Sequence, residues 1–135
     1  MKRSPELAPL SRDHHVALER ALRLRRANER STAAAATAFL DFFEKDGQRH
    51  FEQEERLLIP ALPAEDAALG ERVLTEHADI RALAAQLGSE PEVTIARRLG
   101  ELLAAHVRFE ERELFPRLEA VLPPEQLAEL GGQLG

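Results

Sequence analysis

The sequence predicts an all-α protein, folded as an up-down-up-down four-helix bundle with a short helical tail at its C-terminus. Apolar residues recur at helical spacing along four long segments, and no segment has the alternation that is typical of a β-strand. Short stretches with Pro, Gly or Ser separate the four segments, and short connections favour antiparallel neighbours. At 135 residues, the chain is long enough to bury one substantial hydrophobic core.

The first helix is expected from about residue 11 to residue 28, after an irregular lead-in over residues 1–9. Ser11 is a suitable N-cap, because its hydroxyl can accept a hydrogen bond from a free backbone N–H of the first turn. Asp13 would lie in that turn, where a negative charge is stabilised. A short polar connection should then lead to the next helix.

The second helix is expected from about residue 32 to residue 58, with Gly47 inside it. A glycine within a helix costs about 1 kcal/mol relative to alanine, so we expect a kink or a close helix approach there. Pro60 should end this helix, because proline cannot donate the backbone hydrogen bond that a helix interior needs. The third helix is expected over residues 64–87, where apolar side chains follow one stripe.

The fourth helix is expected to begin near residue 90, after a Gly-Ser-Glu-Pro connection, and to end near residue 118. We expect a bend in it at Pro116, and Pro123 with Pro124 should open a short tail helix. The predicted organisation therefore has three parts, namely an irregular lead-in (residues 1–9), the four-helix bundle (residues 10–120) and the tail helix (residues 121–135).

Composition excludes several classes of function. The formal net charge is −6, and the basic residues are scattered, so we expect no nucleic-acid partner. There is no cysteine, which rules out disulfides, thiolate metal sites and redox thiols. No apolar run approaches the length of a membrane span, and no signal-peptide core follows the first three residues. We therefore expect a cytoplasmic protein that does not associate with a membrane.

One motif occurs twice, as His-x-x-x-Glu-Glu-Arg from His50 and again from His106. Residues four apart lie on the same face of a helix, so His50 should pair with Glu54 and His106 with Glu110. An imidazole and a carboxylate one turn apart suit iron, zinc or manganese. A single copy would indicate little, but two copies in a chain with five histidines predict a metal site between facing helices.

The other two helices each offer an inward histidine. His77 lies at a core-facing position of the third helix, although a lone inward histidine is more often a hydrogen-bonded core residue than a ligand. In the first helix both His14 and His15 are candidates. We favour His15, because the apolar residues Leu18 and Leu22 follow it at helical spacing.

With these residues, the chain resembles the hemerythrin family, specifically the bacterial hemerythrin-like His-His-Glu (HHE) cation-binding domains. The resemblance covers about residues 10–118 and depends on the two His-x-x-x-Glu-Glu motifs, each with a proline ten residues after its histidine, and on the motifs Asp-His-His and Glu-His-Ala-Asp-Ile. It implies a left-handed four-helix bundle with a non-haem di-iron centre, hence two iron ions as cofactors. It also implies a set of metal ligands, with the two glutamates bridging the irons: His15 and His50 for one iron, His77 and His106 for the other, and Glu54 and Glu110 between them.

The sequence departs from the oxygen-carrying members of that family. They have a second histidine one turn after the third-helix histidine, where this chain has Arg81. One iron would then have an open position or a different carboxylate ligand. Glu19 is a candidate for that carboxylate, although we favour a solvent-exposed position for it. Glu55 and Glu111 are interpreted as surface charges, because they are rotated about 140° from the motif histidines.

We expect a protein that binds or senses a small diatomic ligand (O₂ or NO) or iron itself, and a sensing role would need a separate protein partner. The alternative is a small di-iron oxidoreductase that acts on peroxide, NO or Fe(II), and a third hypothesis is a scaffold with a structural metal. A binding module is favoured over an enzyme, because the chain has no Tyr, Trp or Cys to relay electrons. Ferritin-like di-iron proteins use Glu-x-x-His motifs, which this sequence lacks.

Overall fold

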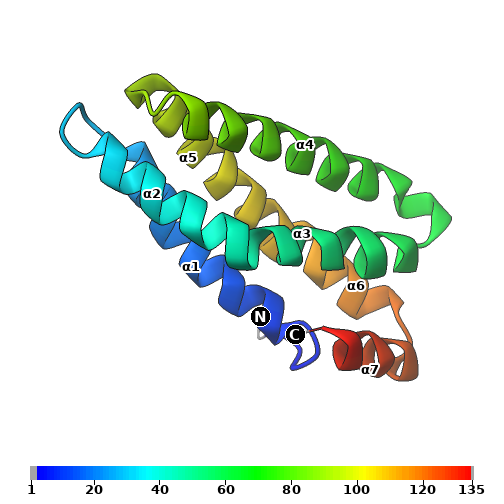
Figure 1. Cartoon of the computed structure of the whole chain (residues 1–135). Coiled ribbons are helices and arrows are strands. Elements are labelled where there is room, and N and C mark those ends of the chain that lie inside the picture. The colour runs from blue at the N-terminus through cyan, green and yellow to red at the C-terminus, as the bar shows by residue number, and fades with distance from the viewer. Residues whose placement is uncertain (1–2, 135) are drawn as a thin grey trace.

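The computed structural model describes residues 3–134, so residues 1, 2 and 135 of the predicted lead-in and tail lie outside the described part of the chain. The fold is all-α, as predicted, with four long helical segments running up, down, up and down and a further helix across one end (Figure 1). The α-helices are α1 (Ala8–Arg25), α2 (Thr32–Phe42), α3 (Gln48–Gln53), α4 (Ala67–Ser89), α5 (Val93–Phe109), α6 (Phe115–Val121) and α7 (Pro124–Gln133).

Two of the four long segments contain π-helical turns, in which a backbone N–H bonds to the carbonyl five residues before it. The π segments are η1 (Phe43–Gly47) and η2 (Glu54–Leu58), which flank α3, and η5 (Glu110–Leu114), which joins α5 to α6. Short 3-10 helices, η3 (Ile59–Ala61) and η4 (Ala64–Asp66), form the turn into α4. Both η2 and η5 begin at the first glutamate of the repeated motif.

The ends of α1 differ from the prediction. The helix begins at Ala8, so Ser11 lies inside it and the predicted N-cap is wrong. Pro9 is accommodated because the N–H groups of a first helical turn need no partner within the helix. The helix ends at Arg25, and the side chain of Asn28 then accepts hydrogen bonds from two backbone N–H groups of the loop, which stabilises a turn there.

Two glycines allow close packing that a side chain would block. Gly47 ends η1, and a Cβ atom there would lie 2.6 Å from Cδ1 of Phe43, so the aromatic ring packs directly on the backbone. Gly100 faces α1, where a Cβ atom would lie 2.7 Å from the carbonyl oxygen of Ala21. The backbones of α1 and α5 therefore approach closely, which brings their inward side chains together.

The buried apolar side chains form two clusters, one toward each end of the bundle. One cluster includes Phe39, Phe43, Ile80, Leu87, Leu99 and Leu103. The other includes Leu7, Leu10, Leu58, Val73, Leu114, Phe115, Leu118 and Leu130. On each long helical segment, a layer of buried polar residues separates the two clusters. The apolar clusters therefore hold the four segments in register on both sides of that layer.

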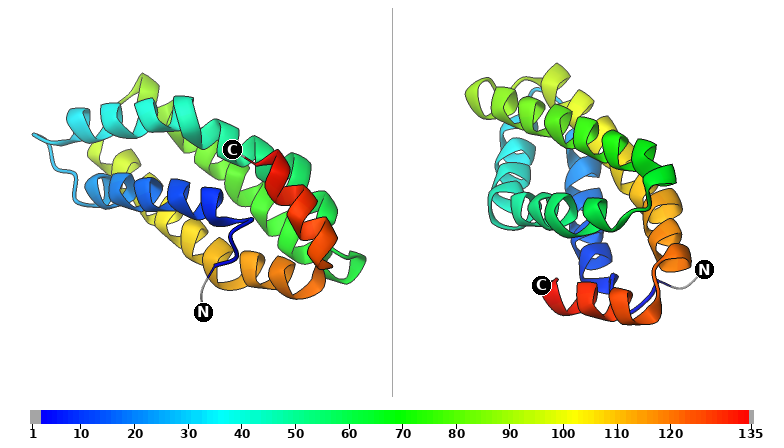
Figure 2. Two further views of the ribbon diagram at one scale, coloured as in Figure 1. Left: turned by 90° about the horizontal axis from the view of Figure 1, so that it is seen from below. Right: turned by 90° about the vertical axis from the view of Figure 1, so that its right-hand side faces the viewer.

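The tail helix α7 closes the second apolar cluster, because Leu130 packs into it. The views in Figure 2 place α7 across the end of the bundle, beside the start of α1. None of the helices formed by residues 3–134 is long and apolar enough to cross a membrane.

Candidate metal centre

Six ionisable side chains with metal-ligating groups are buried in the polar layer, where they meet between the helices. They are His14, His50, Glu54, His77, His106 and Glu110. The two glutamates are fully buried, and none of the four histidines is more than 4% exposed. Burial of so many ionisable groups is costly unless they pair with one another or with a metal. This layer is therefore the strongest candidate for a functional site.

Five of the six predicted side chains lie in this layer, but His15 does not. The inward histidine of α1 is His14, which is 4% exposed, whereas His15 points to solvent. The predicted choice is therefore wrong by one residue. The buried stripe of α1 runs through Leu10, His14 and Ala17, and Leu22, on which the choice of His15 depended, is 41% exposed.

The first ligand group consists of His14 and His50 with both glutamates. The Nε2 atom of His14 lies 2.8 Å from Oε1 of Glu110, and the Nε2 atom of His50 lies 2.9 Å from Oε2 of Glu54. The Nε2 atom of His50 is also 3.6 Å from Oε1 of Glu110. These four side chains place ligand atoms within 4.8 Å of one another.

The second ligand group consists of His77 and His106 with the same two glutamates. The Nε2 atom of His77 lies 2.9 Å from Oε1 of Glu54 and 3.8 Å from Oε2 of Glu110. The Nε2 atom of His106 lies 3.1 Å from Oε2 of Glu110. Each glutamate therefore turns one oxygen toward each group, so the two groups share both carboxylates.

Two buried atoms of the second group lack a hydrogen bond. His106 Nε2 and Glu110 Oε2 are 3.1 Å apart but not in hydrogen-bonding geometry, and neither has another partner. A buried polar atom without a partner costs about 1–3 kcal/mol. Glu110 Oε2 has a lone pair for a cation, and His106 Nε2 offers one once the cation has displaced its proton. Imidazole with carboxylate is a donor set that suits divalent transition metals. The residues present therefore fit a metal ion.

Each of the four histidines also contacts a second carboxylate through its other ring nitrogen, Nδ1. We call Asp13, Glu55, Glu76 and Glu111 the outer carboxylates. The Nδ1–carboxylate distances are 2.6 Å for His14 with Glu111, 3.1 Å for His50 with Asp13, 2.7 Å for His77 with Glu55 and 2.7 Å for His106 with Glu76. A hydrogen bond that keeps a proton on Nδ1 leaves the lone pair of Nε2 free to bind a metal.

The interpretation of Glu55 and Glu111 as surface charges is wrong. Each follows a central glutamate in the π-helical turn and reaches the histidine of a neighbouring helix. The sequence has a signal for the other two outer carboxylates, since Asp13 and Glu76 each come directly before a buried histidine. The same Asp-His and Glu-His pairing would have favoured His14 over His15.

Arginines hold three of the four outer carboxylates. Arg3 lies 3.0 Å from Glu111, Arg72 lies 3.0 Å from Glu76, and Arg81 lies 2.7 Å from Glu55 (N to O distances). Among residues 3–134, no arginine or lysine forms such a pair with Asp13. Three histidines are therefore fixed through a carboxylate and an arginine, and His50 through a carboxylate alone.

Neither residue considered for the extra ligand position joins a ligand group. Arg81 lies one turn after His77, but its guanidinium points to Glu55 rather than to the metal positions. Glu19 is exposed and pairs with Arg20 on the surface of α1. Each ligand group therefore has two imidazoles, with both glutamates shared.

The carboxylates change the charge of this layer. Burial alone would lower the pKa of His106, but Glu110, Glu76 and Glu54 outweigh burial and raise that pKa to about 10. The pKa values of the other three histidines are raised for the same reason, that of His50 most clearly. Burial would raise the pKa of Glu110, but His106 and the hydrogen bonds around the carboxylate hold it well below its ordinary range. In the metal-free protein, imidazolium charges therefore balance the buried carboxylates.

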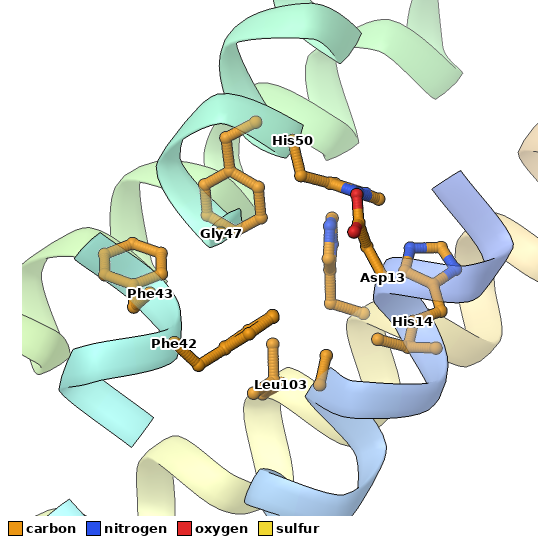
Figure 3. Close-up of a pocket in the computed structure, with 11 residues that line it drawn as sticks. Asp13, His14, Phe42, Phe43, Gly47, His50 and Leu103 are labelled. Carbon is orange, nitrogen blue, oxygen red and sulfur yellow. The ribbon is translucent and has the colours of Figure 1, made fainter. Parts of the chain in front are cut away.

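A small cavity of about 20 Å³ borders His14 and His50 of the first ligand group and His106 of the second. Figure 3 shows Asp13, His14 and His50 on one side of it and Phe42, Phe43 and Leu103 around the rest. A space of this size holds about one water-sized molecule. The cavity gives the first group, through its histidines, a neighbouring space for a small molecule. Phe43 and Leu103 line the cavity, whereas Leu57 and Phe109 do not.

Comparisons with known proteins identify one family. The family model described as the hemerythrin HHE cation binding domain matches residues 7–118, a range that contains all six buried candidate ligands and all four outer carboxylates. No match was found among curated proteins or among solved structures.

Proposed function

The chain belongs to the hemerythrin HHE cation-binding family, and we propose that it holds two iron ions, one in each ligand group. One observation carries this proposal, namely that the two groups share both Glu54 and Glu110, with one carboxylate oxygen turned toward each group. A carboxylate that faces two metal positions can neutralise and bridge both ions. The proposed ligands are therefore His14 and His50 for one ion, and His77 and His106 for the other.

The donor types favour iron. Imidazole with carboxylate is a ligand set that suits iron, and the absence of cysteine removes the thiolates of many structural zinc sites. Each ion would receive two imidazole nitrogens and two carboxylate oxygens from the chain, which leaves coordination positions open. An iron pair with open positions supplies electrons and a binding place for a small diatomic molecule.

The cavity supports a role in binding or sensing O₂ or NO. It borders His14, His50 and His106, and apart from Asp13 its remaining walls are mainly aromatic and aliphatic side chains. Its volume of about 20 Å³ suits a diatomic molecule and excludes larger organic substrates. Apolar walls also limit the access of water to the ligands. A sensing role would require a separate protein partner to receive the signal.

The second candidate function is a small oxidoreductase that acts on peroxide, NO or Fe(II). The observation in its favour is the place of Asp13, which lines the cavity, accepts a hydrogen bond from His50 and has no arginine partner among the described residues. A carboxylate at that place can exchange protons with a molecule in the cavity. Against it, the chain has no Tyr, Trp or Cys that could relay electrons to the site.

Rapid mixing of the anaerobic, iron(II)-loaded protein with NO, O₂ and hydrogen peroxide tests the proposal. A binding protein should give one spectral change per iron pair, reversed when the diatomic ligand is removed. An oxidoreductase should instead consume many equivalents of one reagent when a reductant is supplied. Iron-loaded protein that reacts with none of the three would contradict both roles. The hypothesis of a scaffold with a structural metal would then remain.

A further inference from the structure

Arg81 contacts the carboxylate that holds His77. Its Nη1 donates a hydrogen bond of 2.7 Å to Oε2 of Glu55, and its Nη2 lies 3.3 Å from Oε1 of the same carboxylate. The same oxygen, Oε2 of Glu55, is 2.7 Å from Nδ1 of His77. A guanidinium that contacts both oxygens of a carboxylate restricts its rotation as well as its position.

A second contact places Arg81 beside the ring that covers His77. Phe51 stacks on His77 with 3.7 Å between ring centroids and 11° between ring planes. The guanidinium carbon of Arg81 lies 5.3 Å from the centroid of Phe51, within the range of a cation–π contact. Arg81 therefore contacts the carboxylate that fixes the edge of the imidazole and the ring that fixes its face.

A third partner orients the arginine itself. Its Nε donates a hydrogen bond of 3.1 Å to Oε1 of Gln48, one helical segment away. The side chains of Arg81 and Glu55 are 34% and 25% exposed, so solvent screens their pair less than it screens a fully exposed pair. Arg72, which holds Glu76 at the other histidine of this group, is more exposed at 48%.

From these contacts we infer that Arg81 is a positioning residue of the second ligand group, acting through Glu55 to hold Nε2 of His77 toward its metal position. The inference rests on the proposed metal pair. It gives the residue that stands one turn after His77 a role outside the coordination sphere. Arginine suits that role because a single planar group reaches Glu55 and Gln48 together, whereas a lysine ammonium could satisfy only part of this arrangement.

Metal titration of Arg81→Gln tests the inference. Metal-free protein is titrated with Zn²⁺, which is inert to redox chemistry, in competition with a chelator of known affinity. Loss of an outer hydrogen-bonding partner typically costs about 10–100-fold in metal affinity, so we expect a loss of that order for one of the two ions. The metal affinity of Arg81→Lys should lie between those of Arg81→Gln and the wild type. The matched control is Arg117→Gln, which breaks an arginine–carboxylate pair of 2.7 Å with Asp66, a residue outside the ligand layer.

A double-mutant cycle separates positioning from a purely structural effect. If Arg81 acts through Glu55, then Arg81→Gln should cause little further loss of affinity in a Glu55→Ala background. Thermal melts of the metal-free variants should show similar decreases in melting temperature for Arg81→Gln and Arg117→Gln. An unchanged affinity in Arg81→Gln, or an equal loss with and without Glu55, would overturn the inference while the metal pair stands. Wild-type protein that binds fewer than two ions would instead overturn the proposed function, and the inference with it.

Discussion

The two ligand groups are built from equivalent residues but differ in how firmly the protein holds them. In the second group both outer carboxylates are held by arginines of α4, and its histidines are 0% and 1% exposed. In the first group one outer carboxylate is held by Arg3 of the lead-in, and the other, Asp13, has no arginine partner among residues 3–134. The cavity borders both histidines of the first group but only His106 of the second, and it has Asp13 in its wall.

If the two groups hold metal ions as proposed, this difference predicts that the two groups have different roles. Fixed histidines retain a metal ion, because the ligands cannot turn away without breaking several other contacts. A histidine held by one carboxylate, next to a cavity, can adjust when a small molecule binds. We therefore expect the second group to secure its ion and the first group to offer its ion to the exogenous ligand.

The largest effect should come from removing a carboxylate that both groups share. Glu110 is within 3.8 Å of all four histidines through one oxygen or the other, so Glu110→Ala should lower the binding of both ions. His106→Ala should lower mainly the binding of one ion, that of the second group. Metal analysis of the purified variants measures this, with the exposed Glu113→Ala as the control from the same π segment. Retention of both ions in Glu110→Ala would disprove the bridging arrangement.

A smaller effect, limited to the first group, should follow from His14→Ala. The variant should lose about one ion, since the buried Nε2 atom of His14 faces Glu110, whereas His15→Ala should lose none, since His15 is exposed. The two adjacent residues thus serve as a matched pair. Equal metal content in the two variants would mean that α1 supplies no ligand.

The stability of the metal-free protein should depend on pH differently from that of the metal-loaded protein. A histidine whose folded pKa is raised stabilises the fold fully below its ordinary pKa of 6.5, and this contribution is lost as the pH rises through the folded value, about 10 for His106. The metal-free protein should therefore lose stability from neutral to alkaline pH. Metal binding must displace these protons, so affinity should fall as the pH falls.

Thermal melts with and without metal at several pH values measure whether stability changes with pH in these directions. The gap between the two melting temperatures should widen as the pH rises from 6 toward 9, because the metal-free form weakens while the ligands bind metal more readily. On the acidic side, Glu111 contributes stability above its ordinary pKa of 4.5 that is lost as the pH falls through about 2. A gap that narrows with rising pH would contradict the charge balance described for this layer.

The smallest effect should come from filling the cavity beside the first group. Ala17 lines it, and Ala17→Val should weaken the binding of azide or NO several-fold without changing metal content. Overpacking of this kind costs about 1–3 kcal/mol of stability. Ala104→Val, at a buried position that does not line the cavity, is the control for that cost. An equal loss of ligand binding in both variants would mean that the ligand does not use this cavity.

The sequence predicted which motif side chains lie together, and that placement depends on spacing within one helix. His50 with Glu54, and His106 with Glu110, meet because residues four apart share a helix face. The choice in α1 failed because two adjacent histidines both have apolar neighbours at helical spacing, so periodicity alone does not decide which one is buried.

The remaining features depend on contacts between helices, which periodicity within one helix cannot predict. Arg81 reaches Glu55 on the neighbouring long helical segment, and Glu111 reaches His14 from the opposite end of the chain. The π turns at Glu54 and Glu110 change the number of residues per turn, so angles computed from a regular α-helix misplace the side chains that follow.

The central claim is that one chain holds two metal ions between shared glutamates, and counting the ions tests it most directly. Protein purified without chelators should contain close to two irons per chain, and metal-free protein titrated with Fe(II) under anaerobic conditions should saturate at the same ratio. A single ion per chain, or zinc in place of iron, would contradict the account.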